Sequence, residues 1–354
     1  MNSRLNAVFI ALAAAALFGA ATPLAKALLG SMSAFMVAGL FYLGSGVGLG
    51  IGIVARQISR SAAKPAARHR IQKSELPWLM GAILAGGVAG PALLMLGLSS
   101  TSAAASSLLL NLESVLTAVI AWVVFRENVD LQVFLGMVAI VAGGVLISWH
   151  PGRVAVPVGA LLIVGACLCW AIDNNLTRKV SANDAMVIAC LKGLIAGPVN
   201  LAIAFAAGGR LPAASIVGAA MLTGLAGYGV SLVLFVVALR HLGTARTGAY
   251  FSVAPLFGVA LSLVLWPELP SVFFWVAAAF MALGVWLHVS ERHEHEHTHD
   301  FLEHTHRHHH RDEHHQHEHD FLYTGDGSHT HPHVHLPITH SHAHFPDIHH
   351  RHQH

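Results

Sequence analysis

Long apolar runs separated by short polar segments dominate residues 1–290 of the chain. Each run has about 20 residues, the length at which an α-helix crosses a hydrocarbon layer of about 30 Å. The runs lack the alternation of polar and apolar residues that is typical of membrane β-strands. We therefore predict an all-α integral membrane protein with ten transmembrane helices, over residues 7–29, 33–54, 77–97, 102–125, 131–149, 156–176, 184–206, 215–238, 245–266 and 271–290.

Composition supports a membrane protein. Hydrophobic residues make up 55% of the 354 positions and charged residues 11%. A soluble protein of this length needs more charge to cover its surface. The first run follows Arg4 and so resembles a signal peptide, but it is longer than the apolar region of one, and further runs follow it. We expect it to be retained as a helix.

The short loops between the runs carry their Lys and Arg residues on one side. The loop after the second run is the most basic, and other loops on the same side also carry basic residues, whereas the opposite side holds little beyond Arg153 and Arg210. Short cytoplasmic loops carry an excess of Lys and Arg. We therefore place both termini in the cytoplasm and the chain in the plasma (inner) membrane. The basic residues of the second loop are Arg56, Arg60, Lys64, Arg68, Arg70 and Lys73.

The two halves of the apolar region resemble each other. A shift of 141 positions aligns Gly86 with Gly227 and Glu127 with Glu268, and a shift of 152 aligns Lys26 with Arg178. Each half holds five runs, and an odd number makes the second copy cross the membrane in the opposite sense. We predict inverted repeats over 7–149 and 156–290, the usual architecture of secondary transporters, with a substrate site near the midplane between the halves.

Residues 112–127 resemble the fourth helix of the EamA family, within the drug/metabolite transporter superfamily. Residues 254–268 resemble the ninth helix of that family, and Gly136 with Gly143–Val145 match its fifth. Ser114 stands where the first repeat of the family usually has proline. The resemblance covers residues 7–289 and implies a ten-helix carrier of inverted repeats, which typically exports metabolites, amino acids or drugs.

The function that we predict is therefore secondary transport of a small metabolite by alternating access, with export favoured, and with the lipid bilayer and the small molecule as partners. No phosphate-binding Walker motif is present in the sequence, which argues against direct use of ATP. We see no nucleophile–base set, so an enzyme is not expected, and no nucleic-acid partner is expected either. The substrate, the coupling ion, the direction of transport and a homodimeric assembly are left open.

Charged residues inside predicted helices are the candidates for substrate binding or coupling, because a charge within the bilayer costs several kcal/mol. Glu113 is the deepest, near the middle of the fourth run. It either lines a cavity, where burial would favour the neutral form suited to a proton-coupled carrier, or joins helices by hydrogen bonds.

Asp173 and Lys192 lie on consecutive antiparallel runs at a shared depth of about 10 Å. A paired Asp and Lys is less costly than either residue alone. The pair either binds substrate and gates the pathway or has a structural role. Asn174 would extend this polar patch, and Tyr250 either lines a cavity or packs between helices.

Residues 291–354 differ sharply from the rest of the chain. Residues 1–290 hold 16 Lys and Arg against 7 Asp and Glu, a net charge of +9, whereas residues 291–354 hold 4 against 11, a net charge of −7. Of the 28 histidines, 24 lie in this tail. The composition lacks the apolar residues of a core, so we expect a disordered cytoplasmic tail.

The histidines of the tail recur at alternate positions and in clusters, which suits binding of transition metals. Alternate side chains of an extended segment lie on one side, and neutral imidazole binds Zn, Ni, Co or Cu. The alternative is a solvated tail that responds to pH. A divalent metal exporter fed by the tail and a membrane-tethered metal buffer or sensor also stay open. The candidate ligands are His293, His295, His297, His299, His308, His309, His310, His314, His315, His317 and His319.

Overall fold

The structure is a computed structural model. It describes residues 2–59, 72–125, 131–148, 157–180, 183–242, 250–267, 270–289, 294–299, 302–308, 329–335 and 338–343. The chain divides into two units, Met1–Glu291 and Arg292–His354, each of which is described by itself.

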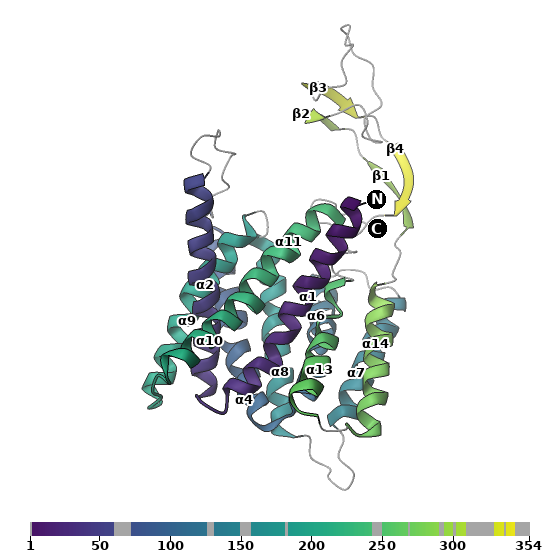
Figure 1. Cartoon of the computed structure of the whole chain (residues 1–354). Coiled ribbons are helices and arrows are strands. Elements are labelled where there is room, and N and C mark those ends of the chain that lie inside the picture. Colours follow the sequence, from purple (N-terminus) through teal and green to yellow (C-terminus); the bar gives the residue numbers. More distant parts are fainter. Residues whose placement is uncertain are drawn as a thin grey trace. The chain divides into compact units, whose positions relative to one another are not determined.

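The first unit is a bundle of helices (Figure 1). Most are α-helices, two are π-helices (η1 and η3) and one is a short 3₁₀-helix (η2). In chain order they are α1 (Asn2–Leu28), α2 (Ala34–Ser59), α3 (Leu76–Ala82), η1 (Ile83–Ala89), α4 (Gly90–Ser100), α5 (Ala103–Leu109), α6 (Leu112–Phe125), α7 (Leu131–Ser148), α8 (Val158–Thr177), η2 (Arg178–Val180), α9 (Ala185–Ala206), α10 (Ala214–Gly224), η3 (Leu225–Val230), α11 (Ser231–Leu242), α13 (Ala254–Leu265) and α14 (Val272–Val289).

Within the described residues, 8 helical stretches are long and apolar enough to cross a membrane. They coincide with the first eight predicted runs. The ninth and tenth runs correspond to two shorter apolar helices, Ala254–Leu265 and Val272–Leu287. Multiple apolar helices therefore make this a multi-pass membrane protein, while the count of ten crossings stays a prediction.

Four of the ten helical stretches, the third, fourth, eighth and ninth, are irregular at positions that correspond between the two halves. The third is continuous through the π-helix η1, and the eighth through the π-helix η3. The fourth breaks at a turn over Leu110 and Asn111, and the ninth at a turn over Ser252 and Val253. The shift of 141 positions that aligns Gly86 with Gly227 relates these irregular segments to within one residue.

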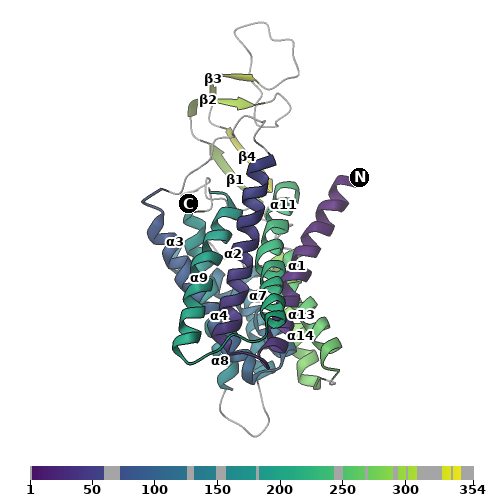
Figure 2. The ribbon, with the colours of Figure 1, turned by 60° about the vertical axis from the view of Figure 1, so that its left-hand side comes forward.

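The packing of the helices also repeats between the halves. Helix α2 packs on α9, and α7 packs on α14. Helix α8 packs on α4 and α6. In the same way, α1 packs on α11 and α13, and Figures 1 and 2 show α11 and α13 running alongside α1. Exchanging each helix for its counterpart in the other half leaves this set of contacts unchanged.

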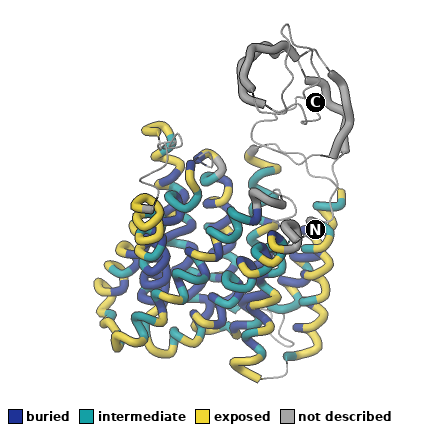
Figure 3. Tube along the Cα trace, turned by 45° about the horizontal axis from the view of Figure 1, so that its top comes forward, coloured by how far each residue is buried: buried dark blue, intermediate teal, exposed yellow. Residues whose placement is uncertain are grey.

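Buried apolar residues fill the interior of the bundle, and many exposed positions on its outer surface are apolar too (Figure 3). Phe41, Met36 and Ile163 are fully buried. Val264 and Val272 are 76% and 77% exposed. Such extensive apolar exposure is unfavourable in water and is expected of a surface that contacts lipid.

The contact between α2 and α9 depends on glycine. A Cβ atom on Gly46 would lie 2.6 Å from the backbone nitrogen of Leu194 and 2.7 Å from the carbonyl carbon of Gly193. Because these neighbours are backbone atoms, they cannot turn aside. Small residues allow this close approach, which is how helices gain packing contacts in lipid.

Four strands are described in the second unit, for which the composition of the sequence predicts disorder. They are β1 (Glu294–His299), β2 (Leu302–His308), β3 (His329–His335) and β4 (Ile338–Ala343). Strand β1 pairs antiparallel with β4, and β2 with β3. The alternation of histidine with other residues has the period of two that strands require, whereas composition carries no information on periodicity.

We predict that Gly46→Ala destabilises the helix bundle. Overpacking of a tight contact costs about 1–3 kcal/mol, and the effect is measured as a lower midpoint of thermal unfolding in detergent. Gly52→Ala, on the same helix, is the control, because a Cβ atom there meets nothing within 4 Å. It should leave the midpoint unchanged or raise it slightly. Equal midpoints for the two variants would contradict the close contact.

Candidate functional site

Glu113 lies in the first turn of α6, directly after the break in the fourth stretch. Polar side chains bond to carbonyl oxygens at this break. Ser114 Oγ donates to the carbonyl oxygen of Asn111 at 2.7 Å, and Asn111 Nδ2 donates to that of Leu108 at 3.0 Å. Serine thus occupies the position where the resemblance expects proline, and the helix still breaks. The positive end of the α6 dipole favours a carboxylate here.

The carboxylate of Glu113 connects α6 to α8. Asn174 Nδ2 donates to Glu113 Oε1 at 2.9 Å, and it also lies 3.4 Å from Thr117 Oγ1. The neighbouring Asn175 donates to the carbonyl oxygens of Thr117 and Ala171 at 3.3 and 2.8 Å. The structure therefore brings together two of the residues proposed from the sequence, Glu113 and Asn174.

Asp173 and Lys192 form an ion pair between α8 and α9. The distance between Lys192 Nζ and Asp173 Oδ1 is 2.5 Å. Thr177 Oγ1 donates to the same carboxylate oxygen at 2.7 Å and accepts from Lys192 Nζ at 3.0 Å. Asp173 is 7% exposed. The structure thus joins this predicted pair and adds Thr177, which the sequence analysis does not single out.

The π-helix η1 borders the same ion pair. Within η1, the carbonyl oxygen of Gly86 accepts hydrogen bonds from Tyr42 Oη at 2.8 Å and from Trp170 Nε1 at 2.9 Å. A Cβ atom on Gly86 would collide with the carboxylate of Asp173. The absence of a side chain at Gly86 therefore lets Asp173 approach the π-helix closely. Single-turn π segments occur frequently at functional sites.

We name Glu113, Asp173, Asn174, Thr177 and Lys192 the polar cluster. It contains two carboxyl groups and one amine from three helices, α6, α8 and α9. Of these two carboxyl groups, Asp173 is paired with a cation, whereas Glu113 is held by a neutral amide. Such a group can bind charged parts of a small molecule and can take up or release a proton. Sequence reasoning missed Tyr42 and Trp170, which support the cluster from outside it.

Tyr250, the remaining candidate from the sequence, is not among the contacts of the polar cluster. It is half-buried, two residues before the turn that precedes α13. Its neighbour Phe251 packs against Phe18 and Phe235, with ring centroids 5.4 and 4.9 Å apart. These ring contacts are those of Phe251, and the role of Tyr250 itself stays a prediction.

The metal ligands proposed in the tail cannot be placed as a site. His295, His297, His299 and His308 lie on strands of which the structure describes only the backbone. Among the side chains that the structure describes, no group of three or more His, Cys, Asp or Glu residues lies together. The other proposed ligands lie outside the described residues: His293, His309, His310, His314, His315, His317 and His319.

We predict that Lys192→Met destabilises the protein strongly, because it leaves the Asp173 carboxylate buried without a partner. The expected loss is about 3–5 kcal/mol in the free energy of unfolding, and the double variant Asp173→Asn/Lys192→Met should recover most of it.

The control for this experiment is an exposed ion pair, Arg56 with Asp184 at 3.8 Å. Arg56→Met should cost less than about 1 kcal/mol. A double variant no more stable than Lys192→Met would contradict a paired buried charge at this site.

Comparison with known proteins places the chain in a family. The model of the EamA-like transporter family matches residues 5–149 and again residues 157–290. A curated relative from Methanothermobacter thermautotrophicus, named an uncharacterized transporter, is 28% identical over 286 residues, which are 76% of this chain and 82% of the relative.

A solved crystal structure is similar in fold. Its TM-score is 0.56 at 16% sequence identity, and the match covers 80% of this chain and 95% of the other. At this identity the similarity concerns the fold alone. Because the family model matches most of the chain, in two copies, the protein belongs to the EamA-like transporter family and is a multi-pass membrane transporter.

Proposed function

We propose that the protein is a secondary transporter that exports a small metabolite by alternating access between two inverted five-helix halves. The observation that carries this proposal is the polar cluster. Its Glu113 belongs to the first match to the family, and its Asp173 and Lys192 belong to the second. The cluster therefore joins the two halves through charged groups within apolar helices, where secondary transporters place their substrate.

The repeated irregularities support two halves of equivalent construction. The π-helices η1 and η3 occupy corresponding positions, as do the breaks before α6 and α13. Irregular backbone at membrane depth is tolerated where protein surrounds it or where it lines a cavity. In transporters such broken helices form the substrate site and the ion site. These four segments are therefore the proposed points at which the halves rearrange.

The charged groups of the cluster suit two different tasks, recognition of the substrate and exchange of a proton. Lys192 offers a cation for an anionic group of the substrate, and Asp173 offers an anion for a cationic one, once their ion pair opens. The carboxyl group of Glu113 is joined to α8 through Asn174, so a change in its protonation would alter the contact between α6 and α8. In this mechanism Glu113 carries the coupling proton.

We further propose that the tail binds Zn, Ni, Co or Cu. The strand register supports this: His304, His306 and His308 of β2 lie opposite His333, His331 and His329 of β3. Residues directly opposite in an antiparallel pair are close neighbours, and alternate residues share one face. Metal held there would regulate the transporter, be buffered by it or be delivered to it. The same histidines favour the second candidate function, export of divalent metal.

We predict that Glu113→Gln abolishes proton-coupled export while leaving the fold intact. The amide keeps the size of the side chain but cannot exchange a proton. Export is measured by comparing metabolites released by cells that carry the wild-type or variant chain. Glu75→Gln is the control, because Glu75 lies at the start of α3 and bonds to Asn183 in the loop before α9. Full export by Glu113→Gln would remove this residue from the mechanism.

We predict that a chain ending at Ser290 loses binding of Zn, Ni and Co. Calorimetry on the purified full chain should show metal uptake at pH 7 that declines below about pH 6.5, where protons compete for imidazole. Uptake unchanged by the truncation would contradict a metal-binding tail.

Metal flux in inside-out vesicles under a pH gradient separates the two candidate functions. Flux that falls on truncation or in Glu113→Gln would make metal the cargo. Binding without flux leaves a metabolite carrier with a regulatory tail.

A further inference from the structure

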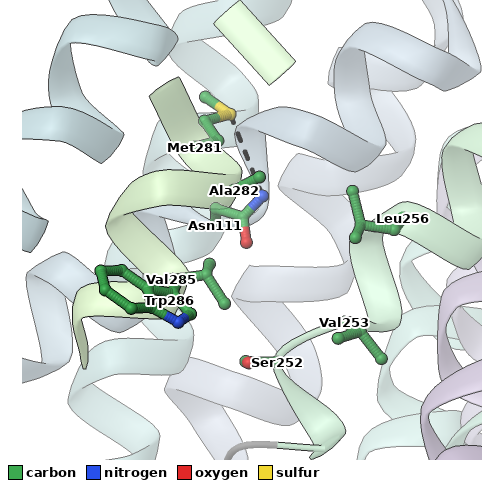
Figure 4. Close-up of a pocket in the computed structure, with 8 residues that line it drawn as sticks. All are labelled: Asn111, Ser252, Val253, Leu256, Met281, Ala282, Val285 and Trp286. Carbon is green, nitrogen blue, oxygen red and sulfur yellow. Dashed lines mark hydrogen bonds between the residues drawn. The ribbon is translucent and has the colours of Figure 1, made fainter. Parts of the chain in front are cut away.

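A cavity of about 190 Å³ lies where the two broken helices meet α14 (Figure 4). Asn111, at the break before α6, and Ser252, at the break before α13, both line it, and the shift of 141 positions aligns these two residues. The remaining lining residues are apolar, and none of the eight is charged. They are Val253, Leu256, Met281, Ala282, Val285 and Trp286.

The amide of Asn111 is oriented by its neighbours. Its Nδ2 donates to the carbonyl oxygen of Leu108 at 3.0 Å and lies 3.9 Å from Met281 Sδ. A carbonyl oxygen accepts only from the amide nitrogen, so the Oδ1 atom must point the other way. Figure 4 shows it turned away from Met281. Among the described residues, no group donates a hydrogen bond to this oxygen.

The cavity opens toward the outer surface of the bundle. Helix α14 packs on α7 and touches α5, but within the described residues it is not closely packed on α13, its neighbour in sequence. Trp286 and Leu256, from these two helices, are 60% and 45% exposed. Apolar residues exposed on a membrane-spanning bundle face lipid. A molecule dissolved in the bilayer can therefore enter between α13 and α14.

We propose that this cavity is a binding site for a neutral, ring-sized apolar molecule with one hydrogen-bond donor, which enters from the bilayer. A cavity of about 150 Å³ accommodates benzene, so this one has room for a single ring with a small polar substituent. The donor of the ligand bonds to Asn111 Oδ1, and the ring packs on Leu256, Val285 and Trp286. The site is separate from the polar cluster and does not depend on the proposed transport function.

The occupant is a compact molecule rather than a lipid acyl chain. An acyl chain carries no donor, so it would leave Asn111 Oδ1 in an apolar environment without a partner, which is unfavourable. A charged ligand is disfavoured as well, because no lining residue offers an opposite charge. A phenol or an indole fits the volume and offers one donor to Asn111 Oδ1.

The test is equilibrium binding of 4-fluorophenol to the full chain in lipid nanodiscs, observed by ¹⁹F NMR with empty nanodiscs as the reference for partitioning. We expect saturable binding. Fluorobenzene, which has the ring but no donor, should bind roughly threefold to tenfold more weakly, as expected for loss of one hydrogen bond. Changing the ligand leaves the bond from Asn111 to Leu108 in place.

Two variants on the exposed side of α14 locate the site. Ala282→Phe fills the cavity from its lining and should abolish saturable binding. Leu283→Phe, at the adjacent position, which does not line the cavity, should bind as the wild type does. Absence of saturable binding, equal affinity for the two ligands, or binding that survives Ala282→Phe would each overturn the proposal.

Discussion

The need to satisfy every backbone polar group within the bilayer governs this structure. A regular helix satisfies its own carbonyl and amide groups, so each irregular segment leaves groups that other residues must bond. At η1 the carbonyl oxygen of Gly86 receives two donors, Tyr42 and Trp170, from two other helices. At the break before α6, Ser114 and Asn111 bond carbonyl oxygens of their own segment. The irregular segments are therefore also the places where polar side chains concentrate.

The polar cluster depends on this arrangement. Asp173 packs directly against Gly86, and only a residue without a side chain at position 86 leaves room for the carboxylate. Trp170 precedes Asp173 by about one turn of α8 and bonds to the same glycine. Helix α8 is thus fixed to the π-helix at two neighbouring points, and Lys192 then joins α9 to it. A rearrangement of η1 would disturb the ion pair, which connects the repeated backbone irregularities to the charged residues.

The sequence predicted the apolar runs well because lipid imposes a single length and composition on them. The first eight helical stretches coincide with predicted runs, and the family assignment is confirmed. The proximity of Asp173 to Lys192 followed from equal depth on consecutive antiparallel helices. The partnership of Glu113 with Asn174 did not follow, because contacts between helices that are distant in sequence depend on their rotation and tilt, which hydropathy does not specify.

Other features were beyond sequence reasoning for local physical reasons. Tyr42 and Trp170 read as ordinary apolar packing residues until their donors are seen to meet one carbonyl group. The π-helices carry no residue signature beyond glycine, which is abundant throughout the helices. The break at Asn111 was not predicted, because Ser114 stands where related chains usually have proline, and serine and asparagine side chains support the break here. In the tail, composition argued against a core, but strand pairing requires only backbone hydrogen bonds and a period of two.

The surroundings of the two carboxyl groups decide which of them is better suited to coupling. Asp173 is fixed by Lys192 and by Thr177, so protonating it would break an ion pair and weaken a hydrogen bond to its charged form. Glu113 has one amide donor and no cation beside it among the described residues, so protonation of Glu113 disrupts fewer favourable contacts than protonation of Asp173. A coupling group must change its state in every cycle, whereas a substrate-binding pair must keep its charges until the substrate arrives. These requirements favour the proposed division of roles, with proton exchange at Glu113 and charge recognition at Asp173 with Lys192, and they give a reason for one cluster to hold both arrangements.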